Sequence, residues 1–343
     1  MLELPVQDRF SRPLRNLRIS VTDRCNLRCT YCMPQEEYAW LPRADILSYE
    51  ELVRLAEAFV SLGVDRIRLT GGEPTLRRGL PTLVSGLAAL PGLTDLAMTT
   101  NALRLQRLAT PLREAGLGRL TVSLDTLQQE RYSKMTRRDG LADALEGIAA
   151  AAEAGFGPIK INTVVVRGRN DDEVMDLLRY AREGGHELRL IEYMDVGGAT
   201  EWDPALVVDH TEILERISAE HGPARALAER GAAPAQRYEL SDGTVFGLIT
   251  STTAPFCGSC DRARLTADGR LFTCLYGRDG LDLRTPLRGG ASTDQLRAHI
   301  AGTWAEREDR GAEERLQLTR RSPLADAVEL REDPHLEMHK RGG

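Results

Sequence analysis

The sequence reads Cys25-Asn26-Leu27-Arg28-Cys29-Thr30-Tyr31-Cys32 directly after an apolar, strand-like run over residues 17–22. Its cysteines follow C-x3-C-x2-C spacing, and thiolates are soft ligands that suit iron–sulfur clusters or zinc. A tetrahedral zinc site needs a fourth ligand, yet no Cys or His follows Cys32 within the next hundred residues. A cubane cluster held by three cysteines would leave one iron open to a small molecule. The stretch favours a cluster, with zinc or three unrelated cysteines as the alternatives.

The six cysteines of the chain fall into two groups of three, and this grouping bears on the compartment. The second group is Cys257, Cys260 and Cys274. The N-terminus has no basic region followed by an apolar core, so no secretory signal is expected. Without such a signal, clustered cysteines favour metal binding over disulfides. We therefore expect a reducing, cytoplasmic location.

The length, hydropathy and charge of the chain narrow the classes of protein to which it can belong. A chain of 343 residues with 42% hydrophobic content can form one large domain or two. It has no run of eighteen apolar residues, so no membrane span is expected. The net charge of −6 is spread along the chain, which argues against nucleic-acid binding as the main function. A small anionic substrate held by a few arginines remains compatible with this charge.

Strand-like and helix-like segments alternate six times in the first part of the chain. The strands are expected at 17–22, 66–70, 95–99, 119–124, 159–166 and 188–193, with amphipathic helices at 48–62, 80–90, 103–115, 141–154 and 171–182. Repeated βα units predict a parallel sheet, and six units are too few for a complete eightfold barrel. We predict an α/β fold: an incomplete (βα)6 TIM-like barrel over 1–195, followed by a C-terminal region over 196–343.

Polar residues follow the predicted strands at the ends where such folds place their chemistry. The second strand runs into Gly71-Gly72-Glu73-Pro74, and the fourth ends at Ser123-Leu124-Asp125. In isolation, the first of these motifs is compatible with an ordinary turn. Two glycines also allow a ligand to approach the backbone closely, and Glu73 could accept from an amine. We expect these groups to converge on one mouth of the barrel.

The second group of cysteines has the spacing C-x2-C-x13-C. Between them, residues 265–272 predict a hairpin with Asp268-Gly269 at its turn, which would bring Cys274 back beside Cys260. A histidine or a distant residue could complete a zinc site here, so zinc is a serious alternative. Two incomplete triads with no cysteine left over fit a pair of open-site clusters better.

The segment 21–34, V-T-D-R-C-N-L-R-C-T-Y-C-M-P, resembles the radical S-adenosylmethionine (radical SAM) superfamily. The resemblance implies a [4Fe–4S] cluster on Cys25, Cys29 and Cys32, with SAM bound at its open iron. It also implies cofactor-binding roles, which carry over to Tyr31, Gly72, Glu73, Ser123 and Met194. From the sequence alone, Met194 fits a role in the hydrophobic core at least as well as a contact with SAM.

The second triad, together with the R-x-R that follows Cys260, resembles the GTP 3′,8-cyclase family of molybdenum cofactor biosynthesis. The resemblance implies a second [4Fe–4S] cluster on Cys257, Cys260 and Cys274, with GTP bound beside it. Catalytic roles are implied for the first triad and for Arg262 and Arg264. The GTP-binding positions of that family match Arg18, Arg68, Thr99, Lys160, Arg262 and Arg264, and we add Arg189 from the sixth strand. Arginine forks bind phosphate oxygens, which agrees with a triphosphate substrate.

The same resemblance implies partners and a role for the C-terminus. It suggests a homodimer, a low-potential electron donor of the flavodoxin or ferredoxin type, and a downstream pterin synthase. The tail of that family ends in two glycines and reaches into the active site. Here Arg341 precedes Gly342-Gly343, where the family commonly has an apolar residue. Two rival interpretations remain: a peptide-modifying two-cluster enzyme with a SPASM-like extension, and a non-catalytic, zinc-stabilised binding module.

Overall fold

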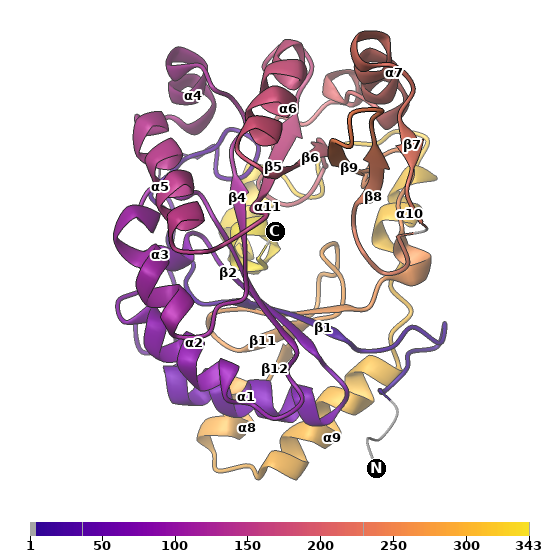
Figure 1. Cartoon of the computed structure of the whole chain (residues 1–343). Helices are drawn as coiled ribbons and strands as arrows, with labels where there is room; N and C mark the ends of the chain where they lie inside the picture. Colours follow the sequence, from indigo (N-terminus) through magenta and orange to yellow (C-terminus); the bar gives the residue numbers. More distant parts are fainter. Residues whose placement is uncertain (1–4, 36, 229, 343) are drawn as a thin grey trace.

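The computed structural model describes residues 5–35, 37–228 and 230–342 of the chain. In this part of the chain, one sheet of twelve strands has the order β12-β11-β10-β1-β2-β3-β4-β5-β6-β9-β8-β7 (Figure 1). The strands are β1 (Asn16–Ser20), β2 (Arg66–Thr70), β3 (Asp95–Thr100), β4 (Arg119–Ser123), β5 (Lys160–Val165), β6 (Glu187–Glu192), β7 (Arg225–Ala226), β8 (Gln236–Glu239), β9 (Val245–Ile249), β10 (Arg262–Leu265), β11 (Arg270–Phe272) and β12 (Leu281–Asp282).

Helices follow the strands in the order that the sequence pattern predicts. They are α1 (Tyr49–Ser61), α2 (Leu80–Ala88), α3 (Leu105–Glu114), α4 (Gln129–Thr136), α5 (Leu141–Glu153), α6 (Val174–Glu183), α7 (His210–His221), α8 (Arg284–Arg288), α9 (Thr293–Ala305), α10 (Gly311–Leu316) and α11 (Ala327–Glu332). The five predicted helices of the barrel correspond to α1, α2, α3, α5 and α6. The short helix α4 was not predicted. None of the helices described is both long and apolar enough to cross a membrane.

The predicted incomplete barrel is confirmed, and the C-terminal region enlarges it. Strands β1 to β6 pair in parallel in chain order. Strand β10 then pairs in parallel with β1, and β9 pairs in parallel with β6. The two edges of the sheet, β12 and β7, do not pair with each other. The barrel therefore stays open, with two further parallel strands that the βα pattern did not reveal.

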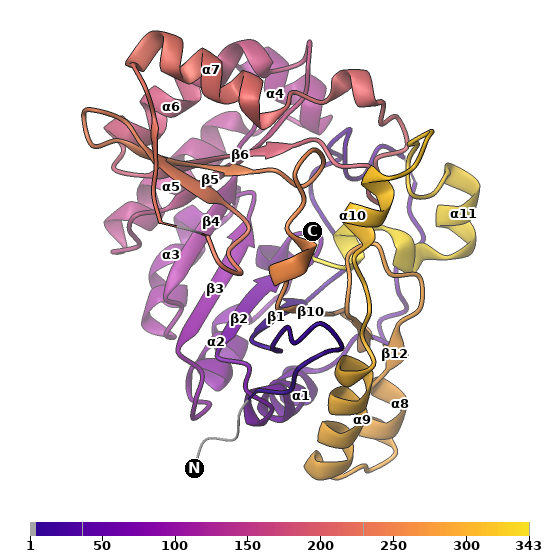
Figure 2. The same ribbon diagram turned by 90° about the vertical axis from the view of Figure 1, so that its right-hand side faces the viewer.

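Because of this pairing, the predicted boundary between 1–195 and 196–343 does not separate two independent domains. Each edge of the first region continues through hydrogen bonds into strands of the second. The C-terminal helix α9 also packs against α1, and both lie at the same end of the molecule in the two views (Figures 1 and 2). The division describes the order of the chain, but the two regions share one sheet.

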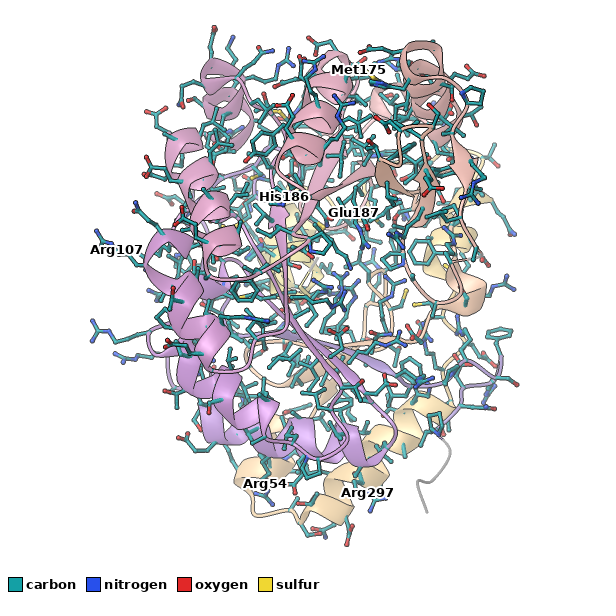
Figure 3. All side chains as sticks on the ribbon, in the orientation of Figure 1. Arg54, Arg107, Met175, His186, Glu187 and Arg297 are labelled. Carbon is teal, nitrogen blue, oxygen red and sulfur yellow. The ribbon has the colours of Figure 1, made fainter. Side chains whose placement is uncertain are left out.

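Side chains alternate between the two faces of each strand, as the pleat requires. In β1, Leu17 and Ile19 are buried in the apolar core under the helices, whereas Arg18 lines the barrel interior. The same alternation places Arg68 inside and Leu69 in the core. In Figure 3, Arg107 points away from the outer helix α3, whereas Glu187 lies among the strands. In these two strands, the apolar residues face the helices and the arginines face the interior.

Candidate functional site

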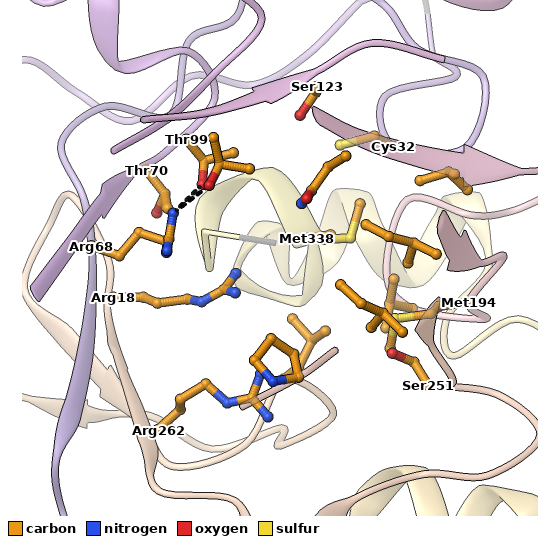
Figure 4. Close-up of a pocket in the computed structure, with 18 of the residues that line it drawn as sticks. Arg18, Cys32, Arg68, Thr70, Thr99, Ser123, Met194, Ser251, Arg262 and Met338 are labelled. Atoms are coloured by element: carbon orange, nitrogen blue, oxygen red, sulfur yellow. Dashed lines mark hydrogen bonds between the residues drawn. The ribbon is translucent and has the colours of Figure 1, made fainter. Parts of the chain in front are cut away.

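A single cavity of about 550 Å³ occupies the barrel interior and brings the two cysteine groups together. All six cysteines line it. So do all the other residues that the sequence singled out: Arg18, Tyr31, Arg68, Gly72, Glu73, Thr99, Ser123, Lys160, Arg189, Met194, Arg262 and Arg264. In Figure 4, Arg18, Arg68 and Arg262 extend from the strands into one space, and Met194, Met338 and Ser251 lie across from them. The cavity therefore contains every predicted site residue.

The first cysteine triad lies in the loop that follows β1. Helix α4 holds this loop, because the backbone N–H groups of Arg28 and Thr30 donate to the carbonyls of Thr136 and Met135, at 2.8 and 2.9 Å. Burial raises the pKa of Cys25 to about 11, and the nearby Glu73 adds to the rise. The pKa values of Cys29 and Cys32 are raised for the same main reason. This end of the cavity therefore favours neutral thiols until a cation or a cluster binds.

The two glycines of the Gly71-Gly72-Glu73-Pro74 motif allow close contact between two backbones. A Cβ on Gly72 would lie 2.2 Å from the carbonyl oxygen of Arg24, and one on Gly71 would lie 2.4 Å from that of Thr22. Gly71 also has a φ of +137°, which side chains disfavour. The sequence suggested that this space admits a ligand. On this side the cysteine loop itself takes the space, so the glycines fix the loop against the end of β2.

Glu73 is buried, and protein groups use both of its carboxylate oxygens. Oε1 accepts from the hydroxyls of Thr75 and Thr100, at 2.6 and 2.7 Å, and Oε2 accepts from the N–H of Asn101 at 2.8 Å. Burial still raises its pKa. Glu73 therefore joins the ends of β2 and β3, and a ligand amine would meet a carboxylate whose position is already fixed.

Tyr31 has a partner, Asp125, which the sequence placed at the mouth of the barrel without giving it a role. Its hydroxyl donates to Asp125 Oδ2 at 2.6 Å, and Asp125 Oδ1 accepts from the N–H of Val164 at 2.9 Å. Burial raises the pKa of Asp125 to about 6. The pair orients Tyr31 beside the first triad. The position of Asp125 at the end of the fourth predicted strand was the available signal.

The second triad is assembled by a turn and by the predicted hairpin. Cys257 begins the turn η4 (Cys257–Ser259) and Cys260 follows it. Strands β10 and β11 pair with Arg264 opposite Phe272, which returns Cys274 toward Cys260. The hairpin turn at Gly269 has a φ of +85°, as expected. Guanidinium groups surround this triad: Arg12 donates to the carbonyl of Cys257 and Arg307 to that of Cys260, both at 2.8 Å. The predicted hairpin is confirmed.

Charge near the second triad differs from that near the first. Burial raises the pKa of Cys260, but Arg262 and Arg307 outweigh it and lower the value to about 7. The side chain of Arg262 lies over the ring of Phe256, 4.7 Å from its centroid. Its Nε is buried and has no hydrogen-bond partner. Burial raises the pKa values of the other two thiols of this triad, Cys257 and Cys274. Cys260 is therefore the thiol that favours the thiolate form, and the arginines beside it favour an anion.

A row of cations without carboxylate partners connects the second triad to the middle of the barrel. Among the described residues, no ion pair involves Arg18, Arg68, Lys160, Arg262 or Arg264, whereas Arg189 pairs with Glu187 at 2.8 Å. Burial and the neighbouring arginines lower the pKa of Arg68 and of Arg264 to about 10. Burial, followed by Arg189 and Arg119, lowers the pKa of Lys160 to about 7. Unpaired charge at this density requires an anion for compensation.

These cations lie deeper in the barrel than the sequence suggested. Arg18 and Arg68 are the middle residues of β1 and β2, and Lys160 and Arg262 are the first residues of β5 and β10. In contrast, Thr70 and Ser123 end β2 and β4, beside the cysteine loop. The interior is thus layered: the first cysteine triad and small polar groups lie at the carboxyl ends of the strands, and the cations lie below them. Cys260 of the second triad lies just before the amino end of β10, on the far side of the cations.

Two further cavity residues, Thr121 and Asn162, were given no role by the sequence, although Asn162 was noted on the fifth predicted strand. Thr121 accepts a hydrogen bond from Arg68 at 3.0 Å. Thr99 accepts from the same guanidinium at 3.2 Å (Figure 4). Asn162 lines the cavity, and its Oδ1 is buried without a partner. Both share the inward side of their strands with a predicted residue, so the alternation along the strand was the signal that could have found them.

The C-terminal tail reaches the interior as far as the structure describes it, and the last residue, Gly343, lies outside the described residues. The carbonyl of Gly342 accepts from Arg18 at 2.9 Å and from Arg264 at 2.8 Å. A Cβ on Gly342 would lie 2.0 Å from the hydroxyl of Thr70. The expectation that the tail approaches the site agrees with this placement.

Arg341 is accommodated although it is charged and buried. Its guanidinium donates to the carbonyls of Leu275, Gly277 and His335. It also lies over the ring of Phe272, 4.1 Å from its centroid. Arg341 therefore fastens the tail to the segment that follows Cys274.

The donor sets of both triads fit iron–sulfur clusters. All six cysteines are free thiols. In the described ranges, no three or more His, Cys, Asp or Glu side chains surround a position for one metal ion. A cubane makes a different demand, because each cysteine binds its own iron atom. Three thiols facing one end of a partly polar cavity, beside buried polar atoms without partners, meet that demand.

Comparisons with known proteins agree with this architecture. Residues 19–181 match the radical SAM superfamily, and residues 186–313 match the family described as Molybdenum Cofactor Synthesis C. Among solved structures, Streptococcus suis SuiB bound to S-adenosylmethionine has a TM-score of 0.59 over 85% of this chain and 68% of its own, at 16% identity. The fold and the first triad thus define a radical SAM protein.

Similar proteins of known function identify the family within the radical SAM superfamily. GTP 3′,8-cyclase 1 of Mycobacterium tuberculosis is 49% identical over 98% of this chain and 95% of its own. GTP 3′,8-cyclase of Xanthomonas axonopodis is 46% identical over 92% and 96%. The chain belongs to the GTP 3′,8-cyclase family of the radical SAM superfamily. Membership implies SAM and a [4Fe–4S] cluster as cofactors.

Proposed function

We propose that this protein converts GTP to (8S)-3′,8-cyclo-7,8-dihydroguanosine 5′-triphosphate, the first step of molybdopterin biosynthesis. The observation that carries the proposal is the single cavity, which holds both cysteine triads and the unpaired cations between them. Its relatives among the GTP 3′,8-cyclases support it. A cytoplasmic location, a homodimer and a downstream pterin synthase belong to the same proposal.

Cys25, Cys29 and Cys32 would hold the first cluster, and Cys257, Cys260 and Cys274 the second. When bound, the first cluster and SAM supply a carbon radical that removes a hydrogen atom from the ribose of the substrate. Tyr31, Gly72, Ser123 and Met194 would contact SAM, because they line the cavity near the carboxyl ends of the strands. Glu73 would contribute as a fixed acceptor.

The chain's own task is to hold the nucleotide between the two triads. A triphosphate carries about four negative charges, and guanidinium forks bind its oxygens bidentately. Arg18, Arg68, Lys160, Arg262 and Arg264 supply unpaired positive charge at the right level of the barrel. Arg262 and Arg264 also lie next to Cys260, so they would fix the base and the phosphates in one orientation. Such positioning brings the ribose toward SAM and limits side reactions.

The experiment is an anaerobic assay of the reconstituted protein with SAM, dithionite and each of the four ribonucleoside triphosphates in turn. We expect 5′-deoxyadenosine to form and GTP alone to be consumed. Slow SAM cleavage that ignores the nucleotide would support the first cluster but reject GTP. Colourless protein loaded with zinc would support the binding module. Modification of a peptide in place of GTP would support the SPASM-like alternative, although buried unpaired cations favour an anionic substrate.

A further inference from the structure

A second hollow, of about 860 Å³, lies on the outer side of the first cysteine loop. Arginines dominate its lining: Arg24, Arg43, Arg77, Arg78 and Arg288. We call it the arginine groove. We propose that the arginine groove docks a small, acidic, low-potential electron-transfer protein that delivers electrons to the first cluster. The proposal rests on the proposed function, in which each SAM cleavage consumes one electron: the donor is oxidised by one electron and the first cluster is reduced by one.

The positive charge of the groove is available to a partner. The side chains of Arg24, Arg43 and Arg78 are exposed. In the part of the chain that the structure describes, none of these three forms an ion pair or donates a hydrogen bond from its guanidinium. The chain as a whole has a net charge of −6, so the groove is a local reversal of sign. A reversal of this kind attracts an acidic surface over a distance of about 10 Å at 0.1 M salt.

The two carboxylates of the groove do not cancel this charge. Asp23 is buried and accepts from the N–H of Leu41 at 2.6 Å. Glu51 is already paired with Arg288, at 2.7 Å. The outward charge of the groove is therefore that of the three free arginines.

Hydrogen bonds to backbone carbonyls hold the walls of the groove, which lowers the entropic cost of docking. Arg77 donates to the carbonyl of Val21 at 2.7 Å and lies over the ring of Tyr49, 4.3 Å from its centroid. Arg288 donates to the carbonyls of Ala44 and Ile46 at 2.7 and 3.2 Å. Two arginines thus fix the walls, and three remain for the partner.

The position of the groove relative to the first triad is the strongest argument. Its lining includes residues 21–24, and Arg24 directly precedes Cys25. On the inner side of the same loop, the carbonyl of Thr22 accepts from Gly72 and that of Arg24 accepts from Glu73, at 2.9 and 2.8 Å. Gly72 and Glu73 line the central cavity. One layer of backbone therefore separates a donor in the groove from the first cluster.

The test measures binding and electron transfer separately. The double variant Arg43→Glu/Arg78→Glu reverses two exposed charges without touching a residue of the cavity. Arg107→Glu, on the outer face of α3, is the matched control, because this arginine is also exposed and lies away from the groove (Figure 3). The probe is an acidic flavodoxin, oxidised for titration calorimetry on the cluster-loaded protein and reduced for SAM cleavage.

We expect the double variant to weaken flavodoxin binding at least about tenfold at low salt, since like charges facing each other oppose association. Affinity of the unmodified protein should fall as salt rises, and Arg107→Glu should bind as the unmodified protein does. Cleavage of SAM driven by dithionite should be unchanged in all three proteins. Unchanged flavodoxin affinity in the double variant, an equal loss in Arg107→Glu, or an equal loss with dithionite would each overturn the proposal. Failure of the unmodified protein to cyclise GTP with dithionite would reject the proposed function and leave the binding result standing as a test of the groove.

Discussion

The two cysteine triads face one cavity, yet their surroundings differ in charge. Around the first, burial together with Glu73 raises the pKa of Cys25 to about 11. Around the second, Arg262 and Arg307 lower the pKa of Cys260 to about 7 despite its burial. The first triad sits in one short loop, whereas the second needs a turn, a hairpin and the contacts of α10. A triad built locally can serve a cofactor of fixed structure, and a triad set among arginines can also recognise an anionic substrate.

Among the variants that test the difference between the two triads, Cys25→Ala should lose the most activity. We expect complete loss of SAM cleavage with any nucleotide, because the first triad has no fourth cysteine to replace the lost ligand. Iron should fall from about eight to about four atoms per chain, since two cubanes become one. The measurement is 5′-deoxyadenosine formation alongside iron analysis. Residual cleavage at the original rate would mean that the first triad is not the site of SAM.

The variant Cys257→Ala should distinguish the role of the second triad from that of the first. We expect SAM cleavage to persist at a low rate and cyclisation of GTP to be lost, because the substrate would lose its position beside the second triad. Iron should again fall to about four atoms per chain. Product analysis by liquid chromatography checks the result, with Cys25→Ala as the paired variant. Normal cyclisation by Cys257→Ala would contradict a role of the second triad in substrate binding.

A comparison of two arginines tests whether unpaired charge binds the phosphates. Arg262→Ala should weaken GTP binding by about 1.5–3 kcal/mol, the usual contribution of a hydrogen bond to a charged group. Arg189→Ala should cost less, because Arg189 already pairs with Glu187 at 2.8 Å. Titration calorimetry on the cluster-loaded variants measures both. Equal losses of GTP affinity in the two variants would show that the ion pair with Glu187 does not reduce the contribution of Arg189 to GTP binding.

The sequence was sufficient for features that depend on near neighbours. The C-x3-C-x2-C loop, the six βα units and the hairpin around Asp268-Gly269 were all predicted, because spacing, periodicity and turn chemistry act over short distances. The predicted site residues, which were taken from the ends of the strands and from the resemblance to a family, all line one cavity.

Features that depend on distant contacts were not available from the sequence. The pairing of β10 with β1 and of β9 with β6 joins segments more than fifty residues apart. The role of Glu73 depends on Asn101 and Thr100, which reach it only in the fold. The seating of Arg341 likewise depends on carbonyls at Leu275 and Gly277. Tertiary contacts decide such details, and one sequence does not display them.

The last prediction concerns pH and tests whether Lys160 belongs to the row of cations that binds the phosphates. Burial, followed by Arg189 and Arg119, lowers the pKa of Lys160 to about 7 in the free protein. Below pH 7 the side chain is charged and attracts the triphosphate; above pH 7 it is neutral until binding supplies a proton. GTP affinity should therefore fall between pH 7 and 9 by up to about tenfold per unit, and Lys160→Met should remove this part of the dependence. Lys134→Met, at an exposed lysine paired with Glu130, should keep it. A pH profile that Lys160→Met leaves unchanged would place the titration elsewhere and remove Lys160 from the row that binds phosphate.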